Sequence, residues 1–239
     1  MKNLLYTLIF FLALPVYSQQ NFASISFGAT LPLGSYGETE DLTSSGYART
    51  GGAIKFDAAW FPVSYLGFGA SFGFGSNYAL GDEVIVDIIK HLQENRPDIG
   101  IPEGATIDYV SGFWNYINLF LGPHFSIRAT QRLYFDMRLL GGLSILKLPD
   151  QELYIEYDGN EIFTTASNSS LSFGFTGGAG LRFKLNDMLA LKLAADYFQT
   201  RAQFDYSFEL FEGVGGAPPV EARFPLQTME FTAGLAYSF

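Results

Sequence analysis

The last twelve residues of this 239-residue chain alternate between large apolar and small or polar side chains. Large side chains occupy Met229, Phe231, Leu235, Tyr237 and Phe239, and small or polar ones lie between them. A period of two is that of a β-strand, because successive side chains point to opposite faces. A strand with one apolar and one polar face is typical of a membrane barrel, whose outside meets lipid and whose lumen is polar.

The same alternation recurs along the chain. It predicts eight strands, at residues 22–31, 52–61, 66–75, 113–127, 133–145, 171–185, 189–206 and 226–239. Each is long enough for a tilted strand to cross a bilayer, which takes about 9–11 residues. An even number of strands is the rule in single-chain bacterial barrels.

The connections between these strands alternate in length. Those at 62–65, 128–132 and 186–188 are short, and those at 32–51, 76–112, 146–170 and 207–225 are long. This order is expected when the short turns lie on the periplasmic side and the long loops outside. The sequence therefore predicts an all-β fold, an eight-stranded antiparallel transmembrane β-barrel with long extracellular loops.

The N-terminus has the pattern of a secretory signal peptide. Lys2 precedes an apolar run from Leu4 to Leu14, and small residues at Val16 and Ser18 precede a cleavage site. The apolar run is too short to span a bilayer as a helix. We expect residues 1–18 to be removed and residues 19–239 to form the barrel domain, in the outer membrane of a Gram-negative bacterium.

Composition narrows the chemistry. The absence of cysteine excludes disulfides and thiolate catalysis. Of the 24 acidic residues, 18 lie in the four long loops, which hold only five basic residues. An acidic extracellular surface repels lipopolysaccharide phosphates, nucleic acid and sulfated sugars, and it favours a basic protein partner or divalent cations. Equally, it can be no more than a solvated loop surface.

The predicted inward faces carry charges of both signs. They include Lys55, Asp57, Asp136, Arg138, Arg182, Lys192, Asp196 and Glu230. An eight-stranded barrel is just wide enough for its own side chains, and charges removed from water must be paired. We expect an ion-pair network that plugs the lumen. The alternative is an ion or proton path, which would make the protein a narrow pore.

One short string suggests catalysis. His124-Phe125-Ser126 resembles the His-x-Ser of outer-membrane lipid A deacylases, which would imply a lipid-modifying enzyme. Alternation, however, places His124 and Ser126 in the lumen near a periplasmic turn, away from outer-leaflet lipid. We therefore expect a non-enzymatic protein with no catalytic residue, cofactor or metal site.

Two of the long loops contain regular patterns. In the second loop Ile85, Ile88, Ile89 and Leu92 recur at helical spacing, which predicts a short amphipathic helix over 82–93. Its apolar stripe could pack on the barrel, dock a partner protein or contact lipid. In the third loop residues 158–160, Asp-Gly-Asn, separate two strand-like segments and predict a protruding hairpin, whose edge could pair with a partner.

Two resemblances complete the prediction. Thr232, Gly234, Tyr237 and Phe239 resemble the C-terminal signal that the barrel-assembly machinery recognises. The mature chain resembles the PorT-like small outer-membrane β-barrel proteins, and four features carry this resemblance: Tyr17-Ser18-Gln19, the Gly-Pro within 121–125, the Arg-Leu-Tyr-Phe of 132–135 and the terminal Tyr-Ser-Phe. Some members of that family assist protein secretion, so the resemblance implies an accessory role in secretion or assembly.

Overall fold

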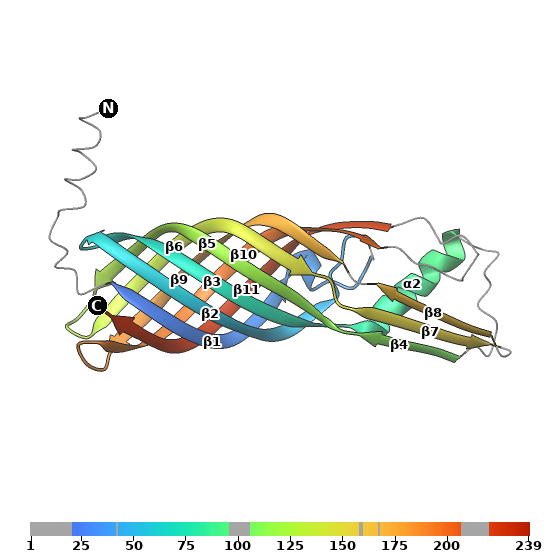
Figure 1. The fold of residues 1–239 in the computed structure, drawn as a ribbon, viewed down its shortest axis with the longest axis horizontal. Helices are drawn as coiled ribbons and strands as arrows, with labels where there is room; N and C mark the ends of the chain where they lie inside the picture. The colour runs from blue at the N-terminus through green and yellow to red at the C-terminus, as the bar shows by residue number, and fades with distance from the viewer. Residues whose placement is uncertain (1–20, 42, 96–105, 158–159, 167, 207–219) are drawn as a thin grey trace, which may run out of the picture.

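The computed structural model describes residues 21–41, 43–95, 106–157, 160–166, 168–206 and 220–239. The predicted signal peptide lies outside this part of the chain. Eight strands form a closed barrel in which every neighbouring pair is antiparallel (Figure 1). They are β1 (Phe22–Leu33), β2 (Ala48–Val63), β3 (Leu66–Ala79), β5 (Phe113–Arg128), β6 (Leu133–Lys147), β9 (Ser169–Lys184), β10 (Leu189–Tyr206) and β11 (Val220–Ser238). The predicted fold class is confirmed.

The strands are tilted, as the pairing register shows. Stepping from partner to partner around the barrel visits Ala23, Ala58, Ala70, Leu121, Gly141, Phe175, Gln199, Gln227 and Leu33. The circuit begins at Ala23 and returns to the same strand ten residues further along, at Leu33. In a closed barrel this stagger fixes the strand tilt and the diameter together, and eight strands leave room only for side chains inside.

The outside of the barrel is apolar. Phe27, Leu139 and Phe173 are 54%, 58% and 71% exposed, and many other outward-facing residues are equally bare. Because so large an apolar surface is unfavourable in water, it marks a surface that contacts lipid. The short turns and the end of β11 lie together at one end of the barrel, which we call the periplasmic end, and the long connections lie at the other (Figure 1).

Towards the extracellular end of the barrel the polarity of the two faces is exchanged, so that apolar residues face inward and polar residues face outward. At the extracellular end of β11 the buried, inward-facing residues are the apolar Phe224 and Leu226. The outward-facing Arg223 is exposed and Gln227 is partly exposed. An apolar inside and a polar outside is the pattern of a sheet surrounded by water. This reversal explains why β11 begins at Val220 rather than at the predicted residue 226, since a pattern with its apolar face outward stops at the membrane surface.

A second sheet extends beyond the barrel. Its strands are β4 (Thr106–Ser111), β7 (Gln151–Tyr157) and β8 (Asn160–Ala166), in the order β4-β7-β8. Asn115 pairs with Lys147 in the barrel, and four residues further out Ser111 pairs with Gln151. The β5–β6 pairing therefore continues through β4 and β7 without a shift in register.

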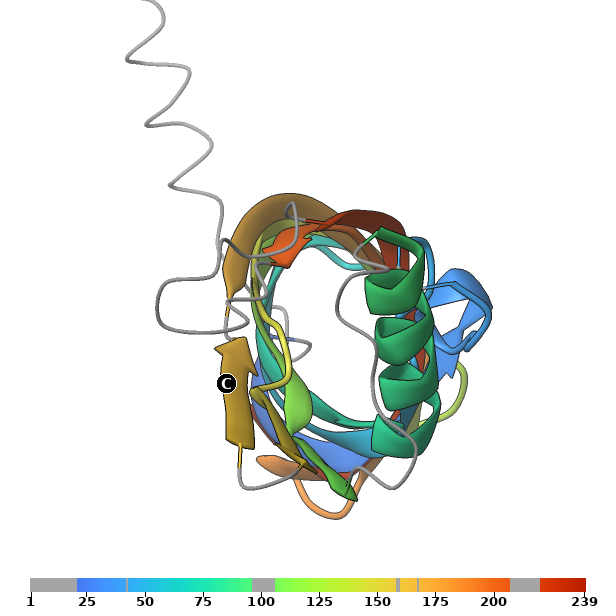
Figure 2. The ribbon, with the colours of Figure 1, turned by 90° about the vertical axis from the view of Figure 1, so that its right-hand side faces the viewer.

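The structure agrees with the predicted hairpin and adds a strand. β7 and β8 pair directly up to Tyr157 and Asn160, and the two residues between them, 158–159, lie outside the described part. β4 was not predicted, and the structure corrects the interpretation of 76–112 as a loop with a single helix. The predicted helix is present as α2 (Gly81–Asn95), beside the barrel mouth (Figure 2). A short 3-10 helix, η1 (Gly34–Tyr36), follows β1.

Candidate functional site

The eight predicted lumen charges all lie inside the barrel. They come from β2 (Lys55, Asp57), β6 (Asp136, Arg138), β9 (Arg182), β10 (Lys192, Asp196) and β11 (Glu230). None is more than 8% exposed. Four carry positive and four carry negative charge, so the set is neutral overall. Neutrality matters here because an uncompensated charge removed from water is strongly destabilising.

Arg138 is the centre of this network. Its Nε and Nη2 atoms donate to the two carboxylate oxygens of Asp196 at 2.8 and 2.5 Å. Its Nη1 atom lies 2.7 Å from Asp57 Oδ1. A guanidinium presents its donors in a fixed fork that matches a carboxylate. One side chain on β6 thus links strands on both sides of the lumen.

Two lysines complete the central layer. Lys55 donates to Asp196 at 3.0 Å and also pairs with Glu230. Lys192 pairs with Asp57, and it donates to Ser24 Oγ at 3.0 Å. Each carboxylate of this central layer therefore meets a cation.

A second cluster lies nearer the periplasmic end. Arg182 donates from Nε and Nη2 to Asp136 at 2.5 and 2.9 Å, and from Nη2 to Ser126 Oγ at 2.9 Å. Its guanidinium carbon lies 3.9 Å from the centroid of the Phe22 ring. Arg182 is therefore held on one side by a carboxylate and on the other by an aromatic face, an arrangement favourable for a buried cation.

His124 and Ser126 do not form a nucleophile–base pair. Both are buried in the lumen, at 3% and 0% exposed, on the face that the alternation predicted. Ser126 Oγ accepts from Arg182, and His124 Nε2 has no hydrogen-bond partner among the described residues, lying 3.9 Å from Asp136 Oδ1. The ring of His124 packs edge-on against Phe61 and Phe22. A nucleophilic serine needs a base within hydrogen-bond reach, and His124 does not supply one in this arrangement.

Apolar layers enclose the charges at both ends of the lumen. The periplasmic layer consists of Phe22, Ala59, Phe61, Ala190 and Ala236. The extracellular layer, called here the aromatic plug, contains Tyr36, Tyr47, Trp114, Tyr116, Phe120, Phe198, Phe204 and Phe224 together with aliphatic residues. Between plug and charges, Tyr116 Oη donates to Glu230 at 2.9 Å and lies 3.1 Å from Thr30 Oγ1.

The aromatic plug is built from segments far apart in the chain. The Trp114 ring contacts Tyr36, Phe204 and Phe224 with centroids 5.5–5.7 Å apart, and its Nε1 donates to Gly46 O at 2.7 Å. Burial raises the pKa of the Tyr36 hydroxyl well above its usual value. Because Tyr36 stays neutral, it can donate to Asn77 Oδ1, 3.3 Å away. The first long loop is thereby fixed inside the mouth.

Half of the predicted docking stripe can be located. Ile85 and the neighbouring Val84 pack against the aromatic plug, and Ile89 is partly buried. The side chains of Ile88 and Leu92 lie outside the described part. Tyr47 donates to Asp87, which ties α2 to the first loop. Ile85 therefore faces the chain's own mouth, while Val86 is 62% exposed on another side of the helix.

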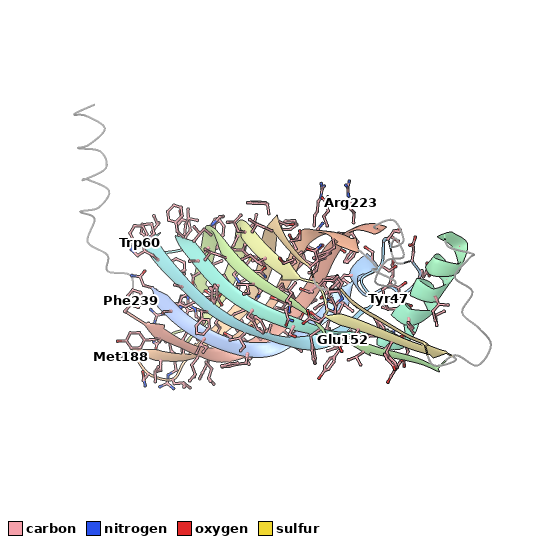
Figure 3. All side chains as sticks on the ribbon, turned by 45° about the vertical axis from the view of Figure 1, so that its right-hand side comes forward. Tyr47, Trp60, Glu152, Met188, Arg223 and Phe239 are labelled. Atoms are coloured by element: carbon pink, nitrogen blue, oxygen red, sulfur yellow. The ribbon has the colours of Figure 1, made fainter. Side chains whose placement is uncertain are left out.

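The residues of the predicted assembly signal divide between the two faces of β11. Tyr237 and Phe239 are 49% and 64% exposed on the lipid face, with stacked rings. Thr232 faces the lumen. Gly234 leaves no space for a side chain, because a Cβ there would lie 2.0 Å from Ile25 O on β1. Figure 3 places Phe239 at the periplasmic end with Trp60 and Met188, and Tyr47 and Arg223 at the opposite end.

Comparisons with known proteins find a similarity of fold alone. No family model matches the chain, and no curated protein matches it. Among solved structures, the attachment invasion locus protein Ail of Yersinia pestis is similar at 15% identity and a TM-score of 0.41, over 92% of this chain and 99% of that one. The outer membrane protein OprG of Pseudomonas aeruginosa is similar at 12% identity and a TM-score of 0.45, covering 92% and 95%. The outer membrane protease OmpT of Escherichia coli is similar at 10% identity and a TM-score of 0.46, covering 92% and 97%.

Two absences hold for the residues that the structure describes. Within them, no helix has the length and apolar character needed to cross a membrane. The same residues contain no group of three or more histidine or acidic side chains placed to hold a metal ion.

Proposed function

We propose that this chain is a non-enzymatic outer-membrane barrel that holds a binding module outside the cell for a partner protein. The observation that carries the proposal is the β4-β7-β8 sheet, which continues the β5–β6 pairing beyond the apolar belt. A sheet of three strands that is not closed leaves two edges, and exposed edges pair readily with extended segments of other chains.

The closed lumen supports the same proposal. Ion pairs fill its centre, and the aromatic plug fills its extracellular end. We infer that a barrel whose lumen is occupied in this way acts through the parts that it exposes. The resemblance to PorT-like proteins favours one kind of partner, a component of a protein-secretion or assembly system. The acidic long loops favour a partner with a basic surface.

The test is the size of the native complex with and without the β7–β8 hairpin. The protein is extracted from its own outer membrane in mild detergent, as wild type and as a variant in which residues 152–165 are replaced by a short turn. We expect the wild type to co-migrate with a defined partner and the variant to migrate as a lone barrel, smaller than the 26.4 kDa of the full 239-residue chain.

A matched control isolates the module from general damage. Altering the β2–β3 turn at the periplasmic end by Tyr65→Ser changes an exposed side chain at the opposite end of the barrel and should leave the complex intact. A wild-type protein that migrates alone, or a hairpin variant that keeps its partner, would contradict the proposal. Amide exchange of β4 and β8 that is unchanged by the partner would exclude pairing at the sheet edges.

A further inference from the structure

The barrel wall divides between β9 and β10 near its extracellular end. Pairing of β9 with β10 stops at Gly174 and Thr200, whereas β9 stays paired with β6 to Ser169 and β10 stays paired with β11 to Tyr206. β9 is preceded in the chain by β8, an edge strand of the β4-β7-β8 sheet. Figure 1 shows that sheet and the ends of β10 and β11 separating as they leave the barrel. We call the facing edges of β9 and β10 beyond Gly174 and Thr200 the seam.

Two hydrogen bonds show which backbone groups point into the seam. The hydroxyl of Thr200 donates to Phe173 O at 3.2 Å, and that of Ser172 donates to Arg201 O at 2.6 Å. Each bond crosses between the two strands, and each accepting residue has an odd number. In an antiparallel strand the N–H and C=O of one residue point to the same side, and neighbouring residues point to opposite sides. The odd-numbered residues of both strands therefore direct their backbone groups into the seam.

Leu171 on β9 and Gln203 on β10 carry the unpaired groups. In the register of Gly174 and Thr200 these two residues would lie opposite each other, but the pairing ends before it reaches them. Among the described residues, no backbone hydrogen bond joins either of them to a strand across the seam. Their other neighbours are in place, since β6 lies beside β9 and β11 beside β10 at this level. Each strand thus has one paired edge and one open edge.

The seam begins at the upper limit of the apolar belt. The outward-facing Leu171 and Phe173 are 66% and 71% exposed, and Leu171 lies opposite Ile145, another exposed apolar residue. On the β10 side the outward-facing Arg201 and Gln203 are exposed and polar. Open sheet edges do not occur in the hydrocarbon region of a membrane, because a backbone group without a hydrogen bond is costly there. An open edge so close to lipid favours occupation by another strand.

The inner side of the seam is apolar. The inward-facing Phe198 and Phe204 of β10 are both 1% exposed and belong to the aromatic plug. A strand placed between β9 and β10 would direct alternate side chains towards these rings and towards the level of Leu171 and Phe173 outside. A strand covered on both faces in this way is mainly apolar in sequence. The chemistry of the seam therefore fits an extended apolar segment.

We propose that the partner protein inserts an extended, mainly apolar segment into the seam, where it pairs with β9 at Leu171 and with β10 at Gln203. One strand in this position satisfies both open edges, which is the β-strand addition by which sheets bind peptides. The open edge of β8 is continuous with that of β9 along the chain. The inference rests on the partner-binding function proposed above, and it selects the β8–β9 edge of the extracellular sheet over the β4 edge.

Residue-resolved amide exchange tests this pairing. It is measured on the full-length protein extracted with its partner in mild detergent, and on the same protein refolded from urea without the partner. We expect exchange of the Leu171 and Gln203 amides to slow on the order of tenfold or more in the complex, because a paired amide exchanges only after local opening. The amides of Ser172 and Thr200 point to β6 and β11 and should be equally protected in both samples.

A pair of substitutions at one position separates the backbone bond from the side chain. Gln203→Pro removes an N–H that points into the seam, at an edge position where proline is tolerated. The amount of partner that co-migrates should fall on the order of tenfold, since a backbone group left without its bond costs about that factor in affinity. Gln203→Thr keeps the N–H and should keep the partner. The shift of the unheated band in gel electrophoresis checks that each variant is folded.

The outcomes distinguish this inference from the function on which it rests. Protection of the β4 amides without protection of Leu171 and Gln203 would overturn the seam and leave the partner-binding function in place. The same holds if Gln203→Pro keeps its partner, or if Gln203→Thr loses it equally, which would reduce the contact to a side chain. A wild-type barrel that migrates alone would remove both proposals.

Discussion

At the scale of single residues, Arg138 is the side chain on which the lumen depends most. It contacts two carboxylates, Asp57 and Asp196, and is 8% exposed. Replacement by methionine would leave two buried acids short of a cation, so we expect Arg138→Met to lower the free energy of unfolding by about 3–5 kcal/mol. Urea titration of the barrel in lipid vesicles measures the change.

The control for this variant is an arginine outside the lumen. Arg128 is exposed and bonds only to carbonyl groups of its own turn, so Arg128→Met should change the unfolding free energy by less than about 1 kcal/mol. Equal effects of the two substitutions would mean that the paired lumen charges do not stabilise the barrel.

Two glycines on one strand offer a sharper comparison. A Cβ at Gly75 would lie 2.0 Å from the Tyr116 ring, whereas a Cβ at Gly73 would meet nothing closer than Lys55 Cγ at 3.8 Å. Both residues face the lumen on β3. Gly75→Ala should displace Tyr116 from Glu230 and destabilise the barrel by about 1–3 kcal/mol, and Gly73→Ala should be tolerated. Thermal unfolding of the two variants under identical conditions measures the difference in stability. Equal unfolding temperatures would contradict the prediction.

Asp41, in the first long loop, gives a pH-dependent prediction. Its carboxylate accepts from the backbone N–H and the hydroxyl of Thr43 at 2.8 and 2.9 Å, and these hydrogen bonds hold its pKa below the usual value. The ionised form therefore supports the loop at pH values above the unfolded pKa of about 4. That support is lost as the pH falls through the lower folded pKa.

The measurement is the chemical shift of the Thr43 amide as a function of pH. We expect it to move at a pH below 4 in the wild type and to stay constant in Asp41→Asn. A midpoint at or above the ordinary carboxyl value would contradict the prediction. Since Asp41 is exposed, global stability should change little.

At the scale of elements, α2 shows how a helix outside the barrel finds its place. Val84 is 4% exposed and packs against the aromatic plug, whereas Val86, two residues on, is 62% exposed. Val84→Asp should therefore loosen α2 from the mouth, because it buries an unpaired charge, and Val86→Asp should not. Amide exchange of α2 measures this. Equal protection in both variants would show that α2 does not depend on the plug.

Two parts of the extracellular region show what alternation can and cannot predict. The β7–β8 hairpin was predicted because a turn signal separated two strand-like segments. β4 was missed because a single edge strand of six residues, placed after a helix, has no local signal of the partner that it pairs with. That partner, β7, lies 40 to 50 residues further along the chain, and its register continues that of β5 and β6.

At the scale of the whole molecule, the contents of the lumen lead to a prediction about conductance. The lumen charges are paired, and the aromatic plug occupies the extracellular end. We expect the purified protein to show no steady conductance in planar bilayers. The Arg138→Met variant provides the comparison, since unpaired charges admit water. Regular open steps of the wild type would make the protein a pore and would remove one support of the proposed binding role.

The sequence by itself determined the class of the protein and the orientation of its side chains. Strict alternation assigns each side chain of a strand either to the lipid face or to the lumen face. This assignment alone predicts that eight charged residues lie inside the barrel: Lys55, Asp57, Asp136, Arg138, Arg182, Lys192, Asp196 and Glu230. Alternation depends only on the geometry of one strand, in which neighbouring side chains point in opposite directions, so it can be recognised locally.

The tertiary structure alone decided which residues meet. Arg138 contacts Asp57 and Asp196, and Tyr36, Trp114, Phe204 and Phe224 pack together in the plug. Both sets of contacts depend on the stagger of ten residues around the barrel, because the stagger decides which residues lie at the same level. A shift of one residue in any pair would exchange faces along the whole strand, and a shift of two would change every cross-lumen partner while preserving the pattern.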